Sequence, residues 1–135
     1  MSEERTVIIE KEFLHPAEKI WRALTQPHLI QEWLMKNDFE PVVGRKFTLD
    51  PRPAWNGQID CQVRVVEENK SLSYDWNSMG VNTVVTWTLT PTKGGVLLRM
   101  EQSGFTAQQE QNFQGAKYGW QRFVGNLEKV LSGLT

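Results

Sequence analysis

The amino-terminal part of the chain predicts one strand followed by two short helices. Apolar and polar side chains alternate in residues 5–13, which is the pattern of a strand. Pro16 fits the first turn of a helix, and Pro27 ends that helix and starts a second, because the first helical residues need no N–H. The apolar positions then follow helical spacing: Ile20, Trp21 and Leu24, then Leu29, Ile30, Trp33 and Leu34.

From Gly44 onward the pattern alternates and predicts a series of short strands joined by turns. The turn-forming segments are residues 50–57, 68–70 and 93–95, together with Gly80. The residues expected to share one buried face are Phe47, Leu49, Ile59, Cys61, Val63, Val65, Leu72, Tyr74, Trp76, Val85, Trp87, Leu89, Val96, Leu98 and Met100. Strands spaced in this way favour an antiparallel meander with one face buried.

Beyond Gly104 the period becomes helical again and predicts a long carboxy-terminal helix. Gly115 and Gly119 each cost about 1 kcal/mol of helix propensity relative to Ala, which suggests that something approaches the backbone there. These glycines also disfavour a coiled coil, so packing onto the sheet is the better use of the helix. Its apolar stripe consists of Phe113, Ala116, Trp120, Phe123, Leu127 and Val130. The pattern as a whole predicts an α+β fold with a sheet of about six strands.

Composition and charge narrow the class of protein. A chain of 135 residues, 39% of them apolar, predicts a single domain over residues 1–135. Fifteen Lys and Arg against sixteen Asp and Glu give a net charge of -1, which disfavours a nucleic-acid partner. No segment approaches the roughly 20 consecutive apolar residues of a membrane span, and the first residues do not read as an export signal. One cysteine, Cys61, and two distant histidines predict neither a disulfide nor a metal site. We therefore expect a cytoplasmic monomer or homodimer without a cofactor.

Four segments of the chain form a recognisable pattern. Residues 21–33 read W-x-A-L-T-x-P-x-x-x-x-x-W, residues 72–76 read L-x-Y-x-W, and residues 103–105 read S-G-F. Gly119 and Trp120 follow in the last helix. In this order, and over residues 6–132, the chain resembles the family of proteins similar to the activator of heat shock protein 90 ATPase, within the START-like (SRPBCC) superfamily.

The resemblance implies a helix-grip (START/Bet v 1-like) fold. In that fold a curved antiparallel sheet wraps a long carboxy-terminal helix and leaves a cavity between them. The family is functionally broad, with members linked to chaperone activation, stress responses and the binding of small molecules. The chain departs from the family pattern at Gly44-Arg45, at Glu68-Asn69, and at Gln102, where a histidine is usual. These changes lie in loops and at edges, so the expected fold is unchanged. They weaken the transfer of a ligand from any particular relative to this chain.

The candidate site is the cavity under the last helix. Its expected lining is Tyr74, Trp76, Trp87, Leu89, Leu98, Met100, Phe113, Trp120 and Phe123. In this hypothesis the rings supply apolar area, while the Tyr74 hydroxyl and the tryptophan N–H groups orient the polar atoms of a ligand. Trp33 and Trp55 are candidates for the cavity mouth, where rings can exclude water. The plainer interpretation of all these residues is that they form or cap the core, which recruits large apolar side chains without any ligand.

No catalytic residue is nominated by the sequence. It contains no G-x-S-x-G elbow, no phosphate-binding loop and no H-E-x-x-H helix, and Cys61 alternates with apolar residues as a buried thiol does. The expected function is binding of a small hydrophobic or aromatic ligand. Two alternatives remain: a co-chaperone-like domain that regulates an ATPase, and a cavity enzyme of the cyclase or hydratase type. Whether the protein is an enzyme is therefore left open.

Overall fold

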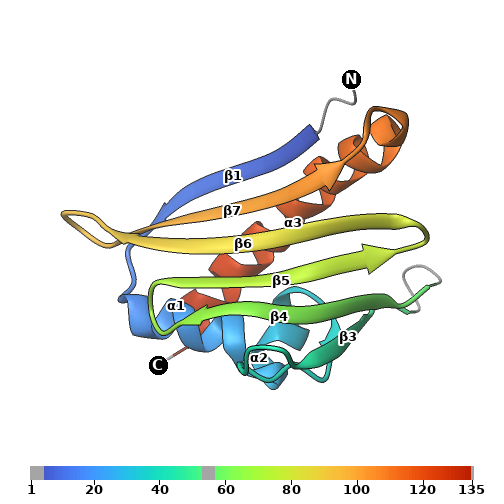
Figure 1. The fold of residues 1–135 in the computed structure, drawn as a ribbon. Helices are drawn as coiled ribbons and strands as arrows, with labels where there is room; N and C mark the ends of the chain where they lie inside the picture. Colours follow the sequence, from blue (N-terminus) through green and yellow to red (C-terminus); the bar gives the residue numbers. More distant parts are fainter. Residues whose placement is uncertain (1–4, 53–56, 135) are drawn as a thin grey trace.

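A curved sheet and one long helix dominate the fold (Figure 1). The computed structural model describes residues 5–52 and 57–134. Its elements in chain order are β1 (Arg5–Phe13), α1 (Ala17–Thr25), α2 (Pro27–Trp33), β2 (Lys36–Asn37), β3 (Lys46–Asp50), β4 (Ile59–Glu67), β5 (Ser71–Ser78), β6 (Val81–Pro91), β7 (Val96–Phe105), the 3-10 turn η1 (Ala107–Gln109) and α3 (Glu110–Gly133). The strands form one antiparallel sheet in the order β1-β7-β6-β5-β4-β3-β2. The predicted α+β helix-grip fold is confirmed, with the two-residue strand β2 added because it is too short to show a period in the sequence.

Local sequence signals set where the helices begin. Pro16 is the N-cap of α1, and its carbonyl oxygen accepts hydrogen bonds from the backbone N–H groups of Lys19, at 3.1 Å, and Ile20, at 3.2 Å. Pro27 is the first residue of α2, as the sequence predicts. A capping box precedes α3, in which the Thr106 backbone N–H donates to Gln109 Oε1 at 3.0 Å. The start of each helix is therefore encoded within a few residues of it.

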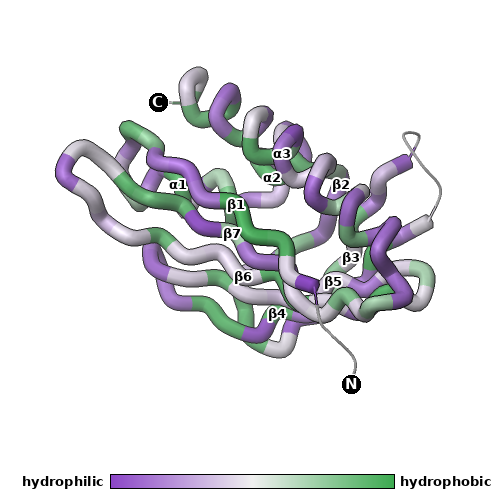
Figure 2. Tube along the Cα trace, turned by 90° about the horizontal axis from the view of Figure 1, so that it is seen from above, coloured by the Kyte–Doolittle hydropathy of each residue, from purple (hydrophilic) through white to green (hydrophobic). Residues whose placement is uncertain are grey.

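All three helices lie on the same side of the sheet, and the core fills the space between them and the strands (Figure 2). The long helix α3 crosses this face and packs against β1 and β7, and near its carboxy-terminal end it packs against α1 and α2 (Figure 1). None of the described helices is both long enough and apolar enough to cross a membrane.

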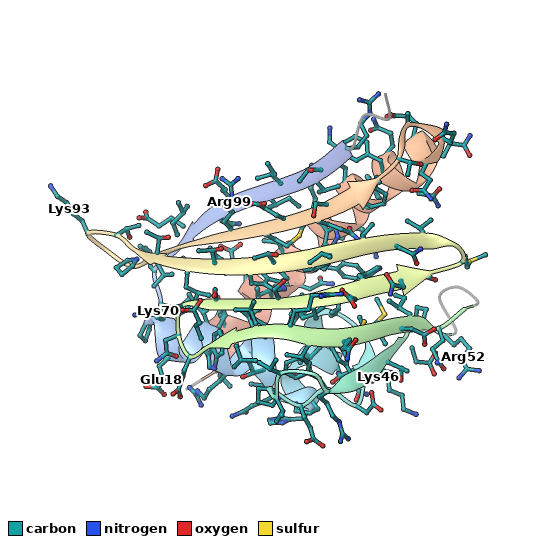
Figure 3. All side chains as sticks on the ribbon, in the orientation of Figure 1. Glu18, Lys46, Arg52, Lys70, Lys93 and Arg99 are labelled. Carbon is teal, nitrogen blue, oxygen red and sulfur yellow. The ribbon has the colours of Figure 1, made fainter. Side chains whose placement is uncertain are left out.

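The opposite face of the sheet is polar. Arg99 on β7, labelled in Figure 3, pairs with Glu101 on the same strand at 2.7 Å and with Glu10 on β1 at 3.6 Å. Lys93 extends from the tip of the β6–β7 hairpin, away from the helices. This one-sided distribution of charge explains why strict alternation in the sequence identifies the buried face of most strands.

A β-bulge in β4 reverses the expected alternation at the end of that strand. Val63 pairs with Tyr74, but Val65 pairs with Ser73, so one extra residue lies on the β4 side. Val65 was expected on the buried face, and it is exposed instead, while Val66 turns partly inward. The physical reason is that a bulge adds one residue to a period of two, which moves all following side chains to the other face.

The buried stripe of α3 also differs from the predicted one. The fully buried residues are Trp120, Val124, Leu127 and Leu131. The predicted members Phe113, Ala116, Phe123 and Val130 are only partly buried against the core. The stripe rotates because the carboxy-terminal half of α3 packs against α1 and α2, whereas its amino-terminal half faces a pocket.

Candidate functional site

A pocket of about 620 Å³ lies between the amino-terminal half of α3 and the sheet. The sheet contributes residues from β4, β5, β6 and β7, including both sides of the β5–β6 hairpin, and the segment between α2 and β2 contributes Leu34 and Met35. The wall consists of Leu34, Met35, Pro51, Ile59, Trp76, Ser78, Met79, Val81, Gln102, Phe105, Asn112, Gly115, Ala116, Tyr118, Gly119, Trp120, Arg122, Phe123 and Asn126. The cavity that the helix-grip fold implies is therefore present.

Aromatic rings form the rigid part of this wall. The Trp120 ring lies 5.1 Å from that of Trp76 and 5.5 Å from that of Phe123, measured between centroids. On its other side Trp120 meets the buried ring of Trp87 edge-on at 5.6 Å, and Trp87 in turn meets Trp33 at 5.6 Å. Trp33, Trp87, Trp120 and Trp76 thus pack in a connected series, and the pocket lies at one end of it. Trp76 and Phe123 are partly buried there, and Trp120 lines the pocket with only 2% of its surface exposed.

A chain of buried hydrogen bonds fixes the ring of Trp120. Its Nε1–H donates to Gln102 Oε1 at 2.7 Å, and Gln102 Nε2 donates to Thr83 Oγ1 at 2.9 Å. The Thr83 hydroxyl then donates to the Trp76 backbone carbonyl oxygen at 2.7 Å. Gln102 is 2% exposed, so each of its amide groups needs a partner in the protein, and each has one. The network fixes Trp76 and Trp120 relative to each other.

The structure divides the predicted lining into three wall residues, five core residues, and Phe113, which packs beside the wall. Trp76, Trp120 and Phe123 lie on the pocket wall. The residues Tyr74, Trp87, Leu89, Leu98 and Met100 lie in the core behind it. Phe113 packs against the wall residue Phe105, with ring centroids 5.9 Å apart. Contact with a ligand at the three wall positions stays a prediction.

Of the two proposed mouth residues, the structure describes only Trp33, and Trp33 is not on the described wall. Trp33 is buried, and its Nε1–H donates to the Ala23 carbonyl oxygen at 2.8 Å, because α2 folds back against α1 and carries the ring into the core. Trp55 lies outside the described residues. Trp33 is therefore a core residue, which was the plainer of its two interpretations from the sequence.

Tyr74 has a structural partner for its hydroxyl. The Tyr74 oxygen accepts a hydrogen bond from Trp87 Nε1 at 3.0 Å, within the core. Burial raises the pKa of this phenol well above its ordinary value, and the Trp87 N–H offsets only part of that effect. We therefore assign Tyr74 to the core polar contacts instead of to the orientation of a ligand.

Sequence reasoning did not identify the face of α3 that lines the pocket. This face carries Asn112, Gly115, Gly119, Arg122 and Asn126, which recur at helical spacing. Gly115 and Gly119 were the available signal for this face, because their low helix propensity inside a long helix needs a structural reason. A Cβ atom added at Gly115 would have no neighbour within 4 Å, so the space above it is open.

Other candidate chemistries find little support in the described part of the chain. Burial raises the pKa of the Cys61 thiol far above its ordinary value, which leaves no thiolate to act as a nucleophile or ligand. Among the described residues, no three His, Cys, Asp or Glu side chains are grouped closely enough to hold a metal ion.

The curved sheet, the long closing helix and the pocket between them define a protein of the helix-grip class. The family described as "Activator of Hsp90 ATPase homolog 1-like protein" matches residues 14–132, so the chain belongs to that family. A comparison with curated proteins gives no match.

Solved structures of similar proteins support the same assignment. The chain is similar to protein MLL2253 from Mesorhizobium loti, with 52% identity over 97% of this chain and 99% of that one, and a TM-score of 0.93. It is similar to BH1534 from Bacillus halodurans, with 25% identity over 94% and 96% of the two chains and a TM-score of 0.81. CalU16 from Micromonospora echinospora shares the fold at 20% identity, over 98% of this chain and 87% of that one, with a TM-score of 0.78.

Proposed function

We propose that the protein binds a small apolar or aromatic molecule in the pocket between α3 and the sheet. The observation that carries this proposal is the pocket itself: about 620 Å³ of space walled by Trp76, Trp120 and Phe123. Ligand sites in proteins commonly enclose about 300–1,000 Å³ and combine apolar walls with a few polar groups. Here Ser78, Asn112 and other polar side chains provide those groups.

The composition of α3 supports a bound molecule over a simple core. A helix that only covers a sheet would place apolar side chains on the inward face, because their burial stabilises the fold by about 1.5–3 kcal/mol each. The inward face of α3 does carry such side chains, at Trp120, Val124 and Leu127, but the pocket-lining positions Gly115 and Gly119 beside it carry none. Gly115 is exposed, and a Cβ atom there would meet nothing within 4 Å. The glycines reduce helix propensity and leave room, which is what a ligand site needs.

The two other functions receive less support. A cavity enzyme needs an activated general acid, base or nucleophile on the wall. The described lining offers the hydroxyl groups of Ser78 and Tyr118, but no Asp, Glu, His, Cys or Lys that could activate them. A co-chaperone needs an exposed apolar patch outside the pocket. Met79 and Tyr118 line the pocket itself, and they are two of the seven large exposed apolar side chains in the described part of the chain. These side chains are Ile8, Leu14, Val42, Val43, Val65, Met79 and Tyr118.

The test combines a ligand panel with a pair of matched variants. Purified protein is titrated with lipids, flavonoids and polyketides while tryptophan fluorescence and melting temperature are recorded, because Trp76 and Trp120 lie on the wall. The variant Gly115→Phe places a ring in the pocket. The control Gly125→Phe makes the same change on the same helix, at a glycine that also has open space but does not line this pocket.

A bound ligand at one hundred times its dissociation constant is expected to stabilise the fold by about 2.7 kcal/mol and to change the fluorescence. Both variants are expected to gain a few tenths of a kcal/mol, up to about 0.5 kcal/mol, from better helix propensity. Gly115→Phe alone should lose ligand binding. A panel without any effect on fluorescence or melting, or equal binding by both variants, contradicts the proposal.

A further inference from the structure

One charged side chain lines the pocket. Among the described wall residues, Arg122 is the only one with a formal charge, and it is exposed to solvent. No acidic side chain is on the described wall to neutralise it. The charge of the pocket is therefore positive, although the chain as a whole has a net charge of -1.

Arg122 also differs from the other described arginines in its partners. Each of the others forms an ion pair: Arg5 with Glu110, Arg22 with Glu18, Arg45 with Glu40, Arg52 with Asp50, Arg64 with Asp75, and Arg99 with Glu101 and Glu10. Within the described part of the chain, the Arg122 guanidinium has no ion-pair or hydrogen-bond partner. Its five N–H donors are therefore available, in a planar arrangement that suits a carboxylate.

The position of Arg122 on α3 relates this charge to the apolar space. Gly115, Gly119, Arg122 and Asn126 lie along one face of the helix. At 1.5 Å per residue, the backbone of Arg122 is about 10 Å along the helix from the open space above Gly115. Trp120 and Phe123 line the same pocket, with ring centroids 5.5 Å apart. An elongated molecule can therefore lie along the helix with one end at each.

We propose that the ligand class is amphipathic acids: molecules with an apolar or aromatic body and one carboxylate, which pairs with Arg122. The body lies against Trp76, Trp120 and Phe123 and extends toward Gly115, and Asn126, one helical turn beyond Arg122, provides a further amide at the polar end. This inference rests on the proposed function, since it names what the same pocket takes. The carboxylate selects the ligand, and the aromatic wall supplies most of the contact area.

The experiment compares three probes that share one ring system and differ in charge: 2-naphthoate, the neutral 2-naphthamide, and the cationic 2-naphthylmethylammonium. Dissociation constants are measured by tryptophan fluorescence at low and high salt. The variants are Arg122→Gln, which removes the charge, Arg122→Lys, which keeps it without the planar fork, and the control Lys117→Gln. Lys117 is exposed on the same helix and is not a wall residue.

The wild type is expected to bind the acid about two- to fivefold more tightly than the amide, and the cation most weakly. Added salt should reduce this preference, because Arg122 is exposed to solvent. Arg122→Gln should bring the ratio of acid to amide affinity to about one, Arg122→Lys should restore part of it, and Lys117→Gln should leave it unchanged. Both Arg122 variants should melt like the wild type, since Arg122 has no described partner to lose. Lys117→Gln should melt close to it, since Lys117 loses only an exposed contact over the Phe113 ring, at 5.8 Å from the centroid.

The outcomes separate this inference from the proposed function. Equal affinity for acid and amide in the wild type, a preference for the cation, or a preference that persists in Arg122→Gln overturns the role of Arg122. The pocket proposal still holds in those cases, because the naphthyl probes bind. If neither these probes nor the wider ligand panel binds, the proposed function fails and this inference fails with it.

Discussion

The buried amide of Gln102 offers the sharpest test of how the pocket wall is held. Gln102 accepts from Trp120 Nε1–H at 2.7 Å and donates to Thr83 Oγ1 at 2.9 Å, with its side chain almost fully buried. The substitution Gln102→Leu keeps a similar volume but removes both polar groups. Thr83 can still donate to the Trp76 carbonyl oxygen, so the indole N–H of Trp120 is the one donor left without a partner.

The expected destabilisation by Gln102→Leu follows from this single unpaired donor. One buried donor without a partner costs about 1–3 kcal/mol, because the group loses its hydrogen bond to water on folding and gains nothing in return. The expected loss is a substantial part of the about 5–15 kcal/mol by which a domain of this size is stable. The matched control is Gln121→Leu, an exposed position on α3 whose substitution should change stability by no more than about 0.5 kcal/mol.

Urea unfolding monitored by tryptophan fluorescence and by circular dichroism measures both variants. A double-mutant cycle with Trp120→Phe isolates the hydrogen bond: the double variant should be less destabilised than the sum of the single variants, by about 1 kcal/mol or more. If Gln102→Leu is no worse than Gln121→Leu, or if the cycle gives strictly additive losses, the reasoning about the Gln102 network is refuted.

Two further predictions concern buried groups away from the pocket. Tyr74→Phe should destabilise the fold by about 1–2 kcal/mol in urea unfolding, because Trp87 Nε1–H loses its acceptor. It should leave affinity for pocket ligands unchanged, and a loss of affinity without a loss of stability would contradict the core assignment of Tyr74. Burial raises the pKa of Cys61, so the folded thiol stays protonated while the unfolded one ionises above pH about 8.5. Below that pH, ionisation of this thiol therefore does not reduce the free energy of unfolding. Above it, the free energy of unfolding should fall, by up to about 1.4 kcal/mol per pH unit. The variant Cys61→Ala should show a flatter decline between pH 8.5 and 10, and identical slopes in the two proteins would count against a buried, neutral thiol.

Much of the fold was predictable because its signals are local. Pro16 and Pro27 specify the starts of α1 and α2, and alternation identifies the inward side chains of β5, β6 and β7. Alternation fails at a few strand positions, for local reasons that the sequence pattern does not show. The bulge that exposes Val65 is one, since a single unpaired residue in β4 leaves no mark in composition or period.

The candidate site was only partly predictable. Periodicity finds which side chains face inward, and it placed Trp76, Trp120 and Phe123 correctly among them. Periodicity cannot distinguish an inward residue that packs against another side chain from one that lines a pocket. Tyr74 and Trp76 show the difference: both were assigned to one face of the same strand, but only Trp76 reaches the pocket.

The sequence by itself determined the order of elements, the buried face of most strands and membership of a family with a cavity. The tertiary structure alone decided which part of α3 the cavity lies under and which of the inward residues line it. That depends on how α3 rotates across the sheet, with Trp120 meeting Trp76 and Trp87 on one side while Gly115 and Arg122 face the open space. Such an arrangement results from contacts between residues far apart in the chain, and a local pattern carries no information about the distance between them.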